Sequence, residues 1–270
     1  MMKIIRFIND QNTEVLGCDY QDGSANQLEG EIYGSLTDTG RRVPVKKLLS
    51  PVAPTNILCI GLNYYLHAKE TGLELPIYPT LFMKNVASAS HPNDPIEIPL
   101  CARKKPEVDY EIELAVVIGK SVKNVSVDDA LDFVAGYTVA NDVSARRWQG
   151  HAGNGQWVRG KSYDTFCPIG PCLVTPDEIA DPQNLNLECR LNGEVMQQAH
   201  TSDMIFSVAQ IISYLSEDTT LIPGTIILTG TPWGVGYTRN PPVYLKQGDL
   251  MELEIEKIGT LVNAVTEPKP

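Results

Sequence analysis

YEIELAVVI, residues 110–118, is the stretch that most strongly decides the fold of this 270-residue chain. Its apolar and β-branched residues predict a strand, in which successive side chains point to opposite faces. Ile112 and Leu114 then belong to the side that faces the core, and Glu111 and Glu113 share the other side. Two carboxylates about 7 Å apart on one strand repel each other, and a cation between them relieves that repulsion. A solvated strand face with two acidic residues is the alternative interpretation.

A third acidic residue follows a second predicted strand. Residues 136–140 are typical of a buried strand, and Asp142 comes shortly after its end. Three carboxylates without a neighbouring Cys or His suit a hard cation, Mg²⁺, Mn²⁺ or Ca²⁺, better than they suit zinc. The sequence therefore predicts a metal site formed by Glu111, Glu113 and Asp142.

Strands dominate the rest of the predicted structure. Short apolar or alternating runs between turn residues predict further strands at 3–8, 14–19, 29–34, 56–61, 226–229, 250–257 and 261–265. A hairpin turn is expected at Asn192-Gly193, because both residue types tolerate the positive φ of a type I′ turn.

The predicted helices are few and short. One spans 64–71, between an Asn63 cap and a Gly72 stop, and two more start at Ser126 and at Ser202. The expected fold class is therefore α+β, dominated by β structure and with a few flanking helices.

A connector rich in proline divides the chain at residues 48–54. Each residue before a proline is pushed towards extended geometry, which favours a boundary here. We expect a small N-terminal β domain at residues 1–50 and a catalytic domain at residues 55–270.

The composition restricts the partners and the compartment. Lys and Arg number 22 and Asp and Glu 33, so the net charge is −11, which disfavours nucleic acid and anionic membranes. No run approaches the roughly 18 apolar residues of a membrane span, and the N-terminus does not read as a secretory signal. Six cysteines without a CxxC pair are expected to be reduced. These features predict a cytoplasmic protein.

A possible general base lies on the first predicted helix. His67 and Glu70 are three residues apart and share one face, so the carboxylate can orient the imidazole and stabilise its charge. An ordinary surface pair is the alternative interpretation.

Residues 155–162, GQWVRGKS, match the phosphate-binding pattern GxxxxGK[ST]. We reject a nucleotide site, because a P-loop needs an apolar strand before it and a helix after it, and here polar residues precede it and prolines follow. Lys161 remains of interest, since an ammonium beside carboxylates can stabilise an anionic substrate or a developing enolate. A solvated lysine is the alternative.

Several segments together resemble the fumarylacetoacetate hydrolase family, in the family's order. They are GLNYYLHAKE at 61–70, YEIELAVVIG at 110–119, NDVSARRWQ at 141–149, RGKSYDTFCPIGP at 159–171 and LTGTPWGVG at 228–236. The resemblance implies a mixed β-roll catalytic domain with a small N-terminal domain, a homodimer, and a divalent cation, usually Mg²⁺. The implied ligands are the same three carboxylates that the strand pattern indicates.

The resemblance also implies roles for single residues. His67 and Glu70 match the family's water-activating dyad, and Lys161 matches its substrate lysine. The predicted substrate-binding residues are Gln149, Thr231, Gly230 and Arg146. The sequence departs from the family pattern at Arg147, at Asn85 and in the loop 149–160, which leaves the substrate's identity open.

The chemistry expected from this set is cleavage of a C–C bond in a small 1,3-dicarbonyl acid such as an acylpyruvate. Water activated by the dyad would attack the distal carbonyl, and the cation and the lysine would stabilise the enolate leaving group. Decarboxylation or keto–enol isomerisation of a β-keto acid such as oxaloacetate is the alternative on the same site. A metal-binding dimer without activity is a further alternative, against which the complete set of site residues argues.

Overall fold

The computed structural model describes residues 2–268, and strands make up most of its regular structure. The strands of the largest sheet are, in spatial order, β2 (Glu14–Gln21), β3 (Ser24–Gly30), β4 (Leu36–Leu49), β1 (Lys3–Asn9), β13 (Cys167–Val174), β11 (Val134–Asn141), β10 (Ile112–Ile118), β16 (Thr225–Leu228), β5 (Asn56–Gly61) and β6 (Thr80–Lys84), and β7 (Ala89–Ser90) pairs with β13.

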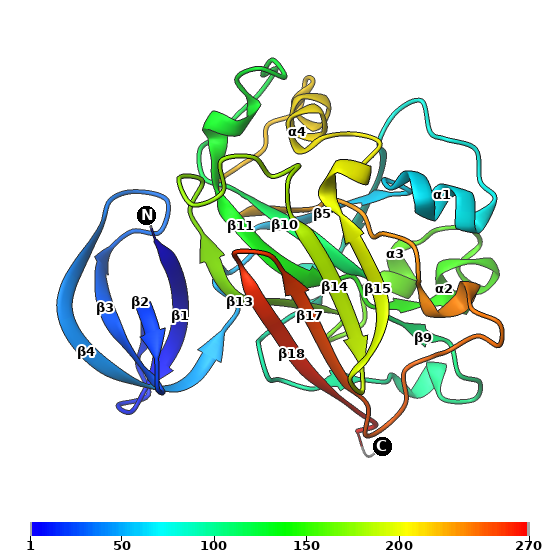
Figure 1. The fold of residues 1–270 in the computed structure, drawn as a ribbon, viewed down its shortest axis with the longest axis horizontal. Coiled ribbons are helices and arrows are strands. Elements are labelled where there is room, and N and C mark those ends of the chain that lie inside the picture. Colours follow the sequence, from blue (N-terminus) through cyan, green and yellow to red (C-terminus); the bar gives the residue numbers. More distant parts are fainter. Residues whose placement is uncertain (1, 269–270) are drawn as a thin grey trace.

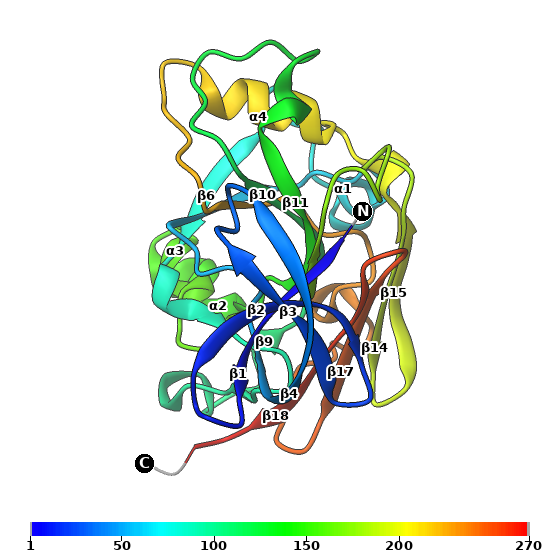
Figure 2. The same cartoon turned by 90° about the vertical axis from the view of Figure 1, so that its left-hand side faces the viewer.

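A second sheet packs along the first (Figures 1 and 2). In spatial order it contains β15 (Glu194–His200), β14 (Asn186–Leu191), β17 (Leu250–Ile255), β18 (Gly259–Thr266) and β8 (Ile96–Glu97), while β9 (Val108–Asp109) and β12 (Ser144–Ala145) form a separate pair. Most neighbouring strands are antiparallel, but β5 with β16, β7 with β13 and β8 with β18 are parallel. The predicted β-dominated α+β class is confirmed.

Both faces of β10 are buried. Ile112 and Leu114 belong to a core that also contains Leu253 of the second sheet. Ala115 and Val117, on the other face, belong to a second core. The alternative of a solvated face is therefore wrong, and the acidic residues at the head of this strand lie inside the molecule.

The predicted hairpin is present. Asn192 and Gly193 have φ values of 54° and 81° and join β14 to β15. The predicted strands at 250–257 and 261–265 correspond to β17 and β18, which pair in register from Leu250 with Ala264 to Ile255 with Gly259 and form a second hairpin.

The first four strands lie at one side of the molecule (Figure 1). The expected strand at 29–34 has the wrong bounds, because the chain turns after Gly30 and continues as the long strand β4. β1 also pairs with β13, through Lys3 with Val174 and Ile4 with Leu173, so these strands extend the large sheet. The division into domains at 1–50 and 55–270 stays a prediction.

The α-helices of the described residues are short. They are α1 (Tyr65–Thr71), α2 (Arg146–Gln149), α3 (Val158–Lys161) and α4 (Val208–Ser216). Single 3₁₀ turns lie at Val86–Ser88, Leu100–Ala102, Ala130–Phe133, His151–Gly153, Thr201–Asp203 and Gly236–Thr238. Figure 1 shows α1, α2 and α3 on the side of the molecule opposite to β1–β4.

Helix α1 has the predicted position but not the predicted cap. Gly72 ends it in the left-handed conformation, with a φ of 70°. Asn63 is not its cap, because the Asn63 side chain donates to the Thr229 carbonyl and accepts from the Phe206 N–H. The carboxylate of Asp203 accepts the Leu66 N–H instead, so a distant segment stabilises the start of this helix.

The other two predicted helix starts are wrong. Ser126 lies in a turn closed by its hydrogen bonds with Asp129. Ser202 lies in a 3₁₀ turn, and α4 begins only after Ser207, which forms a capping box with Gln210.

No helix within residues 2–268 is long and apolar enough to cross a membrane. The six cysteines are free thiols, and all but Cys101 are buried.

Candidate active site

Three carboxylates converge at the head of β10. One oxygen from each of Glu111, Glu113 and Asp142 lies within 4.8 Å of the others, and all three residues are buried. β10 and β11 are antiparallel neighbours, so Asp142, just after β11, lies beside Glu111, whose carbonyl accepts its N–H at 2.9 Å. The predicted convergence is confirmed, and a divalent cation is a ligand that this triad could bind.

A small cavity of about 100 Å³ opens onto the triad. Its walls include five other predicted site residues, which are His67, Arg146, Gln149, Lys161 and Thr231. Glu70 and Gly230 lie behind this wall, where Glu70 contacts His67 and Gly230 contacts Glu113. The tertiary structure therefore gathers all ten predicted site residues in one place, while their roles stay predictions.

Two buried lysines neutralise part of the triad. Lys161 of α3 lies with its Nζ 2.7 Å from Glu111 Oε2 and 2.6 Å from Asp142 Oδ2. Lys84, at the end of β6, lies with its Nζ 2.5 Å from Asp142 Oδ1 and also donates to the Val143 carbonyl. The alternative of a solvated lysine is wrong for Lys161, which is 2% exposed.

The pKa values of the two glutamates move in opposite directions. Burial would raise the pKa of Glu111, but the charges and hydrogen bonds of Lys161 and Arg146 outweigh it and lower that pKa to about 2. Burial and the neighbouring charges of Asp142 and Glu111 raise the pKa of Glu113 well above its usual value. Without a cation, repulsion by Asp142 and Glu111 therefore favours the protonated form of Glu113 over the ionised one. Hard oxygen donors and unrelieved repulsion together fit a divalent cation.

The predicted dyad is formed. His67 Nδ1 lies 2.9 Å from Glu70 Oε2. Burial would raise the pKa of Glu70, but hydrogen bonds from His67, Thr238 and the Gly234 N–H leave it below the usual value. An ionised carboxylate only accepts, so Nδ1 of a neutral His67 carries the proton and Nε2 is the free base. The alternative of a surface pair is wrong, because His67 is buried and lines the cavity.

Gly230, which was predicted to bind substrate, binds a carboxylate of the protein itself. The Gly230 N–H donates to Glu113 Oε2 at 2.6 Å. A side chain at this glycine would meet Asn63, since a Cβ there would lie 2.7 Å from the Asn63 Cβ. Thr231 Oγ1 donates to the Ile112 carbonyl, and its side chain lines the cavity. Gly230 therefore orients Glu113, and Thr231 is the member of this pair that faces the cavity.

Arg146 holds other site residues in place. Its Nη1 donates to Glu111 Oε1 at 2.6 Å and to Gln149 Oε1 at 3.0 Å. Its Nε and Nη2 lie 2.8 Å and 2.7 Å from Asp109 Oδ2. Because the Gln149 oxygen accepts from Arg146, the amide nitrogen of Gln149 is the group left to donate to a substrate.

The segment that matches the P-loop pattern forms a wall of the cavity. Trp157 packs so closely on Gly61 that a Cβ there would lie 2.4 Å from its ring. The same ring meets Phe82 edge-on, with centroids 5.2 Å apart. Lys161, which a P-loop would direct at phosphates, points to the carboxylates instead. This arrangement agrees with the rejection of a nucleotide site.

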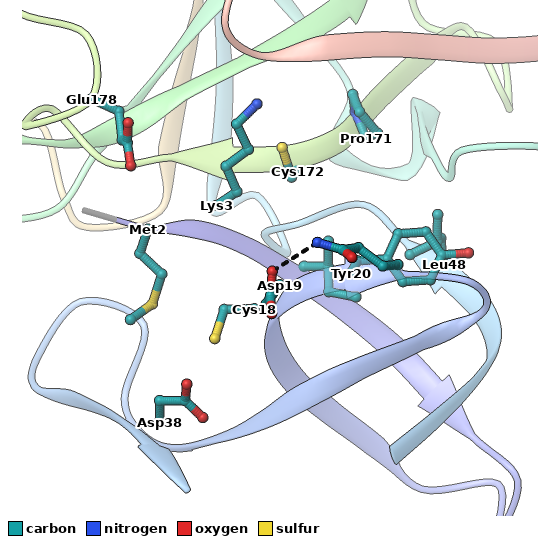
Figure 3. Close-up of a pocket in the computed structure, with 12 residues that line it drawn as sticks. Met2, Lys3, Cys18, Asp19, Tyr20, Asp38, Leu48, Pro171, Cys172 and Glu178 are labelled. Atoms are coloured by element: carbon teal, nitrogen blue, oxygen red, sulfur yellow. Dashed lines mark hydrogen bonds between the residues drawn. The ribbon is translucent and has the colours of Figure 1, made fainter. Parts of the chain in front are cut away.

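A larger cavity, of about 550 Å³, lies between β1, β2 and β13 (Figure 3). Two thiols line it, and burial raises the pKa of Cys18 and of Cys172 to about 11, so both stay protonated and unreactive near neutral pH. The triad and the dyad lie elsewhere, which makes the small cavity the candidate active site.

Sequence reasoning missed Lys84, Asp109 and Tyr237, although all three contact predicted site residues. The sequence contains a feature that could have indicated two of them. Lys84 ends the otherwise uncharged run TLFM, and Asp109 lies two residues before Glu111. Tyr237, whose ring covers the Arg146 guanidinium at 4.4 Å, has no such signal.

Known proteins are similar to this chain in sequence and in fold. Residues 56–266 match the family model described as fumarylacetoacetate (FAA) hydrolase, C-terminal. The chain is 50% identical over 236 residues to the fumarylacetoacetate hydrolase domain-containing protein 2 homolog of Dictyostelium discoideum, with 83% of this chain and 76% of that protein covered. It is 48% identical over 218 residues to human oxaloacetate tautomerase FAHD2A, mitochondrial, with 80% and 68% covered.

A solved structure agrees over the whole length. The crystal structure of 2-hydroxyhepta-2,4-diene-1,7-dioate isomerase from Mycobacterium marinum matches with a TM-score of 0.85 at 36% identity, and both chains are covered to 100%. These similarities and the family match lead to one conclusion: the chain belongs to the fumarylacetoacetate hydrolase family.

Proposed function

We propose that this enzyme catalyses the keto–enol tautomerisation of a small 2-oxo dicarboxylic acid such as oxaloacetate. The observation that carries the proposal is that His67, whose Nδ1 contacts Glu70, lines the same small cavity as Lys161 and the acidic triad. Relatives named oxaloacetate tautomerase and a structural neighbour named as an isomerase support it.

The proton transfer follows from the site's geometry. His67 Nε2 would take a proton from the carbon between the two carbonyl groups, and Glu70 would stabilise the imidazolium that forms. The ammonium of Lys161 would stabilise the negative charge that develops on the substrate's 2-oxo oxygen, and the proton then returns to that oxygen. No water is consumed in this reaction.

A divalent cation has a defined place in this proposal. Glu111, Glu113 and Asp142 would hold it, and Mg²⁺ is the ion that we propose, with Mn²⁺ or Ca²⁺ as alternatives. When bound, it would supply Lewis acidity towards the substrate's oxygens. The amide nitrogen of Gln149 is the proposed donor that orients the substrate, and the side chain of Thr231, which lines the same cavity, is a further proposed contact.

Hydrolysis of an acylpyruvate is the second candidate. It is favoured by the same dyad, because a base that removes a carbon-bound proton can equally activate water. A cation and Lys161 next to the leaving enolate would suit the cleavage step. Decarboxylation of oxaloacetate needs no such base and is the third candidate.

A substrate panel separates these candidates. Enol-to-keto conversion of oxaloacetate is followed by ultraviolet absorbance, acetylpyruvate cleavage by release of pyruvate, and decarboxylation by release of CO₂, each with and without EDTA. We expect the fastest EDTA-sensitive reaction to be the tautomerisation. EDTA-sensitive cleavage of acetylpyruvate without tautomerisation would assign the enzyme to the hydrolases instead.

We also propose a homodimer. Of the exposed large hydrophobic side chains in residues 2–268, half lie between residues 65 and 86, with Ile77 84% exposed and Tyr78 68% exposed. Residues 75–83 carry no charge, and two chains of net charge −11 need such a face to associate. Light scattering should give a dimer for the wild type and a monomer for Ile77→Asp/Tyr78→Asp. A wild-type monomer would contradict the proposal.

The compartment is also a proposal. The printed name of the human relative is that of a mitochondrial protein. For this chain we keep the cytoplasm as the expected location, and fractionation of cells that produce it is the test.

A further inference from the structure

Asp109 is a buried carboxylate with an unusual number of donors. Its side chain is fully buried, at 0% exposure. Oδ1 accepts the N–H groups of Tyr110 at 2.9 Å and Gly236 at 2.8 Å, and Oδ2 accepts the Tyr237 N–H at 3.0 Å. Arg146 donates its Nε to Oδ2 at 2.8 Å and forms an ion pair with it, with Nη2 2.7 Å away. An anion is stable in this position because donors surround it, and each donor is held in place in return.

The cluster formed by Asp109 and its donors contacts the acidic triad through Arg146. Arg146 is shared between Asp109 and Glu111, and the ring of Tyr237 lies over its guanidinium at 4.4 Å. The single positive charge of Arg146 is therefore shared between two carboxylates, so Arg146 neutralises Glu111 only in part. Less neutralisation of Glu111 leaves more negative charge for a cation at the triad.

The cluster around Asp109 also includes a segment that contacts the His67–Glu70 dyad. Two backbone N–H groups of the segment 234–238, those of Gly236 and Tyr237, donate to the Asp109 carboxylate. The same segment donates to Glu70 Oε1 from the Gly234 N–H at 2.9 Å and from Thr238 Oγ1 at 2.8 Å. Glu70 is thus positioned by a loop that Asp109 anchors.

We propose that Asp109 is a positioning residue that couples the two halves of the active site, the acidic triad through Arg146 and the His67–Glu70 dyad through segment 234–238. It does not line the cavity, so it acts through these neighbours. The kinetic part of this inference rests on the proposed function, whereas its binding and exchange parts do not.

The first test is Asp109→Asn, which keeps the shape and removes the charge. Freed from Asp109, Arg146 would pair more fully with Glu111 and compete with the cation. Calorimetry with Mn²⁺ should show about 10–100-fold weaker binding, the range typical of lost outer partners of metal ligands. The kcat for oxaloacetate tautomerisation should fall by about 10–100-fold with a smaller change in KM, since Glu70 loses its fixed position.

Two matched variants separate positioning from general damage. Asp249→Asn makes the same change at another buried carboxylate, which accepts from Asn192 and from the Lys246 N–H away from the site. It should leave Mn²⁺ affinity and kcat unchanged. Thr238→Val removes a hydroxyl that lies within hydrogen-bond distance of Glu70 Oε1 and of the Val235 carbonyl and leaves Asp109 and Arg146 in place, so it should lower kcat without changing Mn²⁺ affinity. The kcat losses of Asp109→Asn and Thr238→Val should not add in the double variant.

A measurement on the wild type covers the case that Asp109→Asn does not fold. Mg²⁺ binding at the triad should slow amide hydrogen exchange of Gly236 and Tyr237, because the loop and the triad share Arg146 and Asp109. The amides of residues 246–250, held by Asp249, serve as the unaffected reference.

Three results would overturn the inference. They are wild-type Mn²⁺ affinity in folded Asp109→Asn, additive kcat losses in the double variant, and exchange at 236–237 that does not respond to Mg²⁺. If the wild type binds Mn²⁺ and shows the exchange response but does not turn over oxaloacetate, the proposed function fails while the coupling stands.

Discussion

Lys84 Nζ lies 2.5 Å from Asp142 Oδ1, and both side chains are completely buried although 58 residues separate them in sequence. The pair joins the end of β6 to the acidic triad. Because Lys161 occupies the other oxygen of Asp142, this carboxylate has an ammonium on each side. The site therefore balances its negative charge with buried lysines before any cation binds.

The first prediction concerns this pair. Lys84→Met leaves Asp142 buried without one of its partners, and breaking a buried ion pair costs about 3–5 kcal/mol of unfolding free energy. Urea denaturation should show that loss, and Mg²⁺ should restore part of it, because a cation replaces the missing positive charge. Equal stability of both proteins without Mg²⁺ would contradict the prediction.

The second prediction concerns Lys161. Lys161→Met removes the ammonium that would stabilise charge on the substrate, and the expected loss of kcat is about 10²–10³-fold, as for other groups that stabilise a developing oxyanion. Lys120→Met is the control and should keep full activity, because Lys120 is exposed and its ammonium donates to the Asp132 carbonyl, away from the site. A kcat/KM that is unchanged in Lys161→Met would remove this residue from the mechanism.

The third prediction separates proton transfer from decarboxylation. His67→Ala removes the base, so tautomerisation or acylpyruvate cleavage should fall by about 10²–10⁴-fold. Any oxaloacetate decarboxylation should be largely retained, since it relies on the cation and Lys161. The control His200→Ala changes a half-buried histidine outside the cavity, whose ring contacts Ser202. Equal loss of both activities in His67→Ala would disprove a base specific to proton transfer.

The fourth prediction concerns residues 155–162. Lys161 is engaged with two carboxylates and Trp157 packs on Gly61, so ATP and GTP should not bind this segment. Calorimetry at millimolar nucleotide is the measurement. Micromolar affinity that disappears in Lys161→Met would show that the pattern match has a function after all.

The fifth prediction concerns pH and His91. Its Nδ1 accepts the Ser50 N–H at 3.0 Å, which only an unprotonated nitrogen can do. Burial, with Lys47 and Arg6 nearby, lowers the pKa of His91 below 6.5. A lowered histidine pKa means that the folded state favours neutral His91. The resulting contribution to the free energy of unfolding is therefore present above pH 6.5 and is lost as the pH falls through the pKa of the folded state.

The measurement is urea denaturation from about pH 7 to about pH 5. Wild-type stability should fall more steeply over this range than that of His91→Gln, whose amide oxygen can accept from Ser50 at every pH. Parallel curves for the two proteins would show that His91 does not contribute.

Much of the site was predictable from neighbours in sequence. The alternation around Glu111 and Glu113 predicts two carboxylates on one side of a strand, and the strand before Asp142 predicts the third. The spacing of His67 and Glu70 predicts their contact within one helical turn. The Asn192-Gly193 turn is equally local, since φ preferences of two residues determine it. Such features depend on periods of two or about four residues, which the sequence displays directly.

Only the tertiary structure decided which partners these groups have. The order of strands in the large sheet, which no local period encodes, buries both faces of β10 and brings Lys84 to Asp142. Asp109 accepts from Gly236 across 127 residues, and Leu66 takes its cap from Asp203 across 137 residues. These contacts form because buried polar groups must find partners wherever the fold places them, and that place is a property of the whole chain.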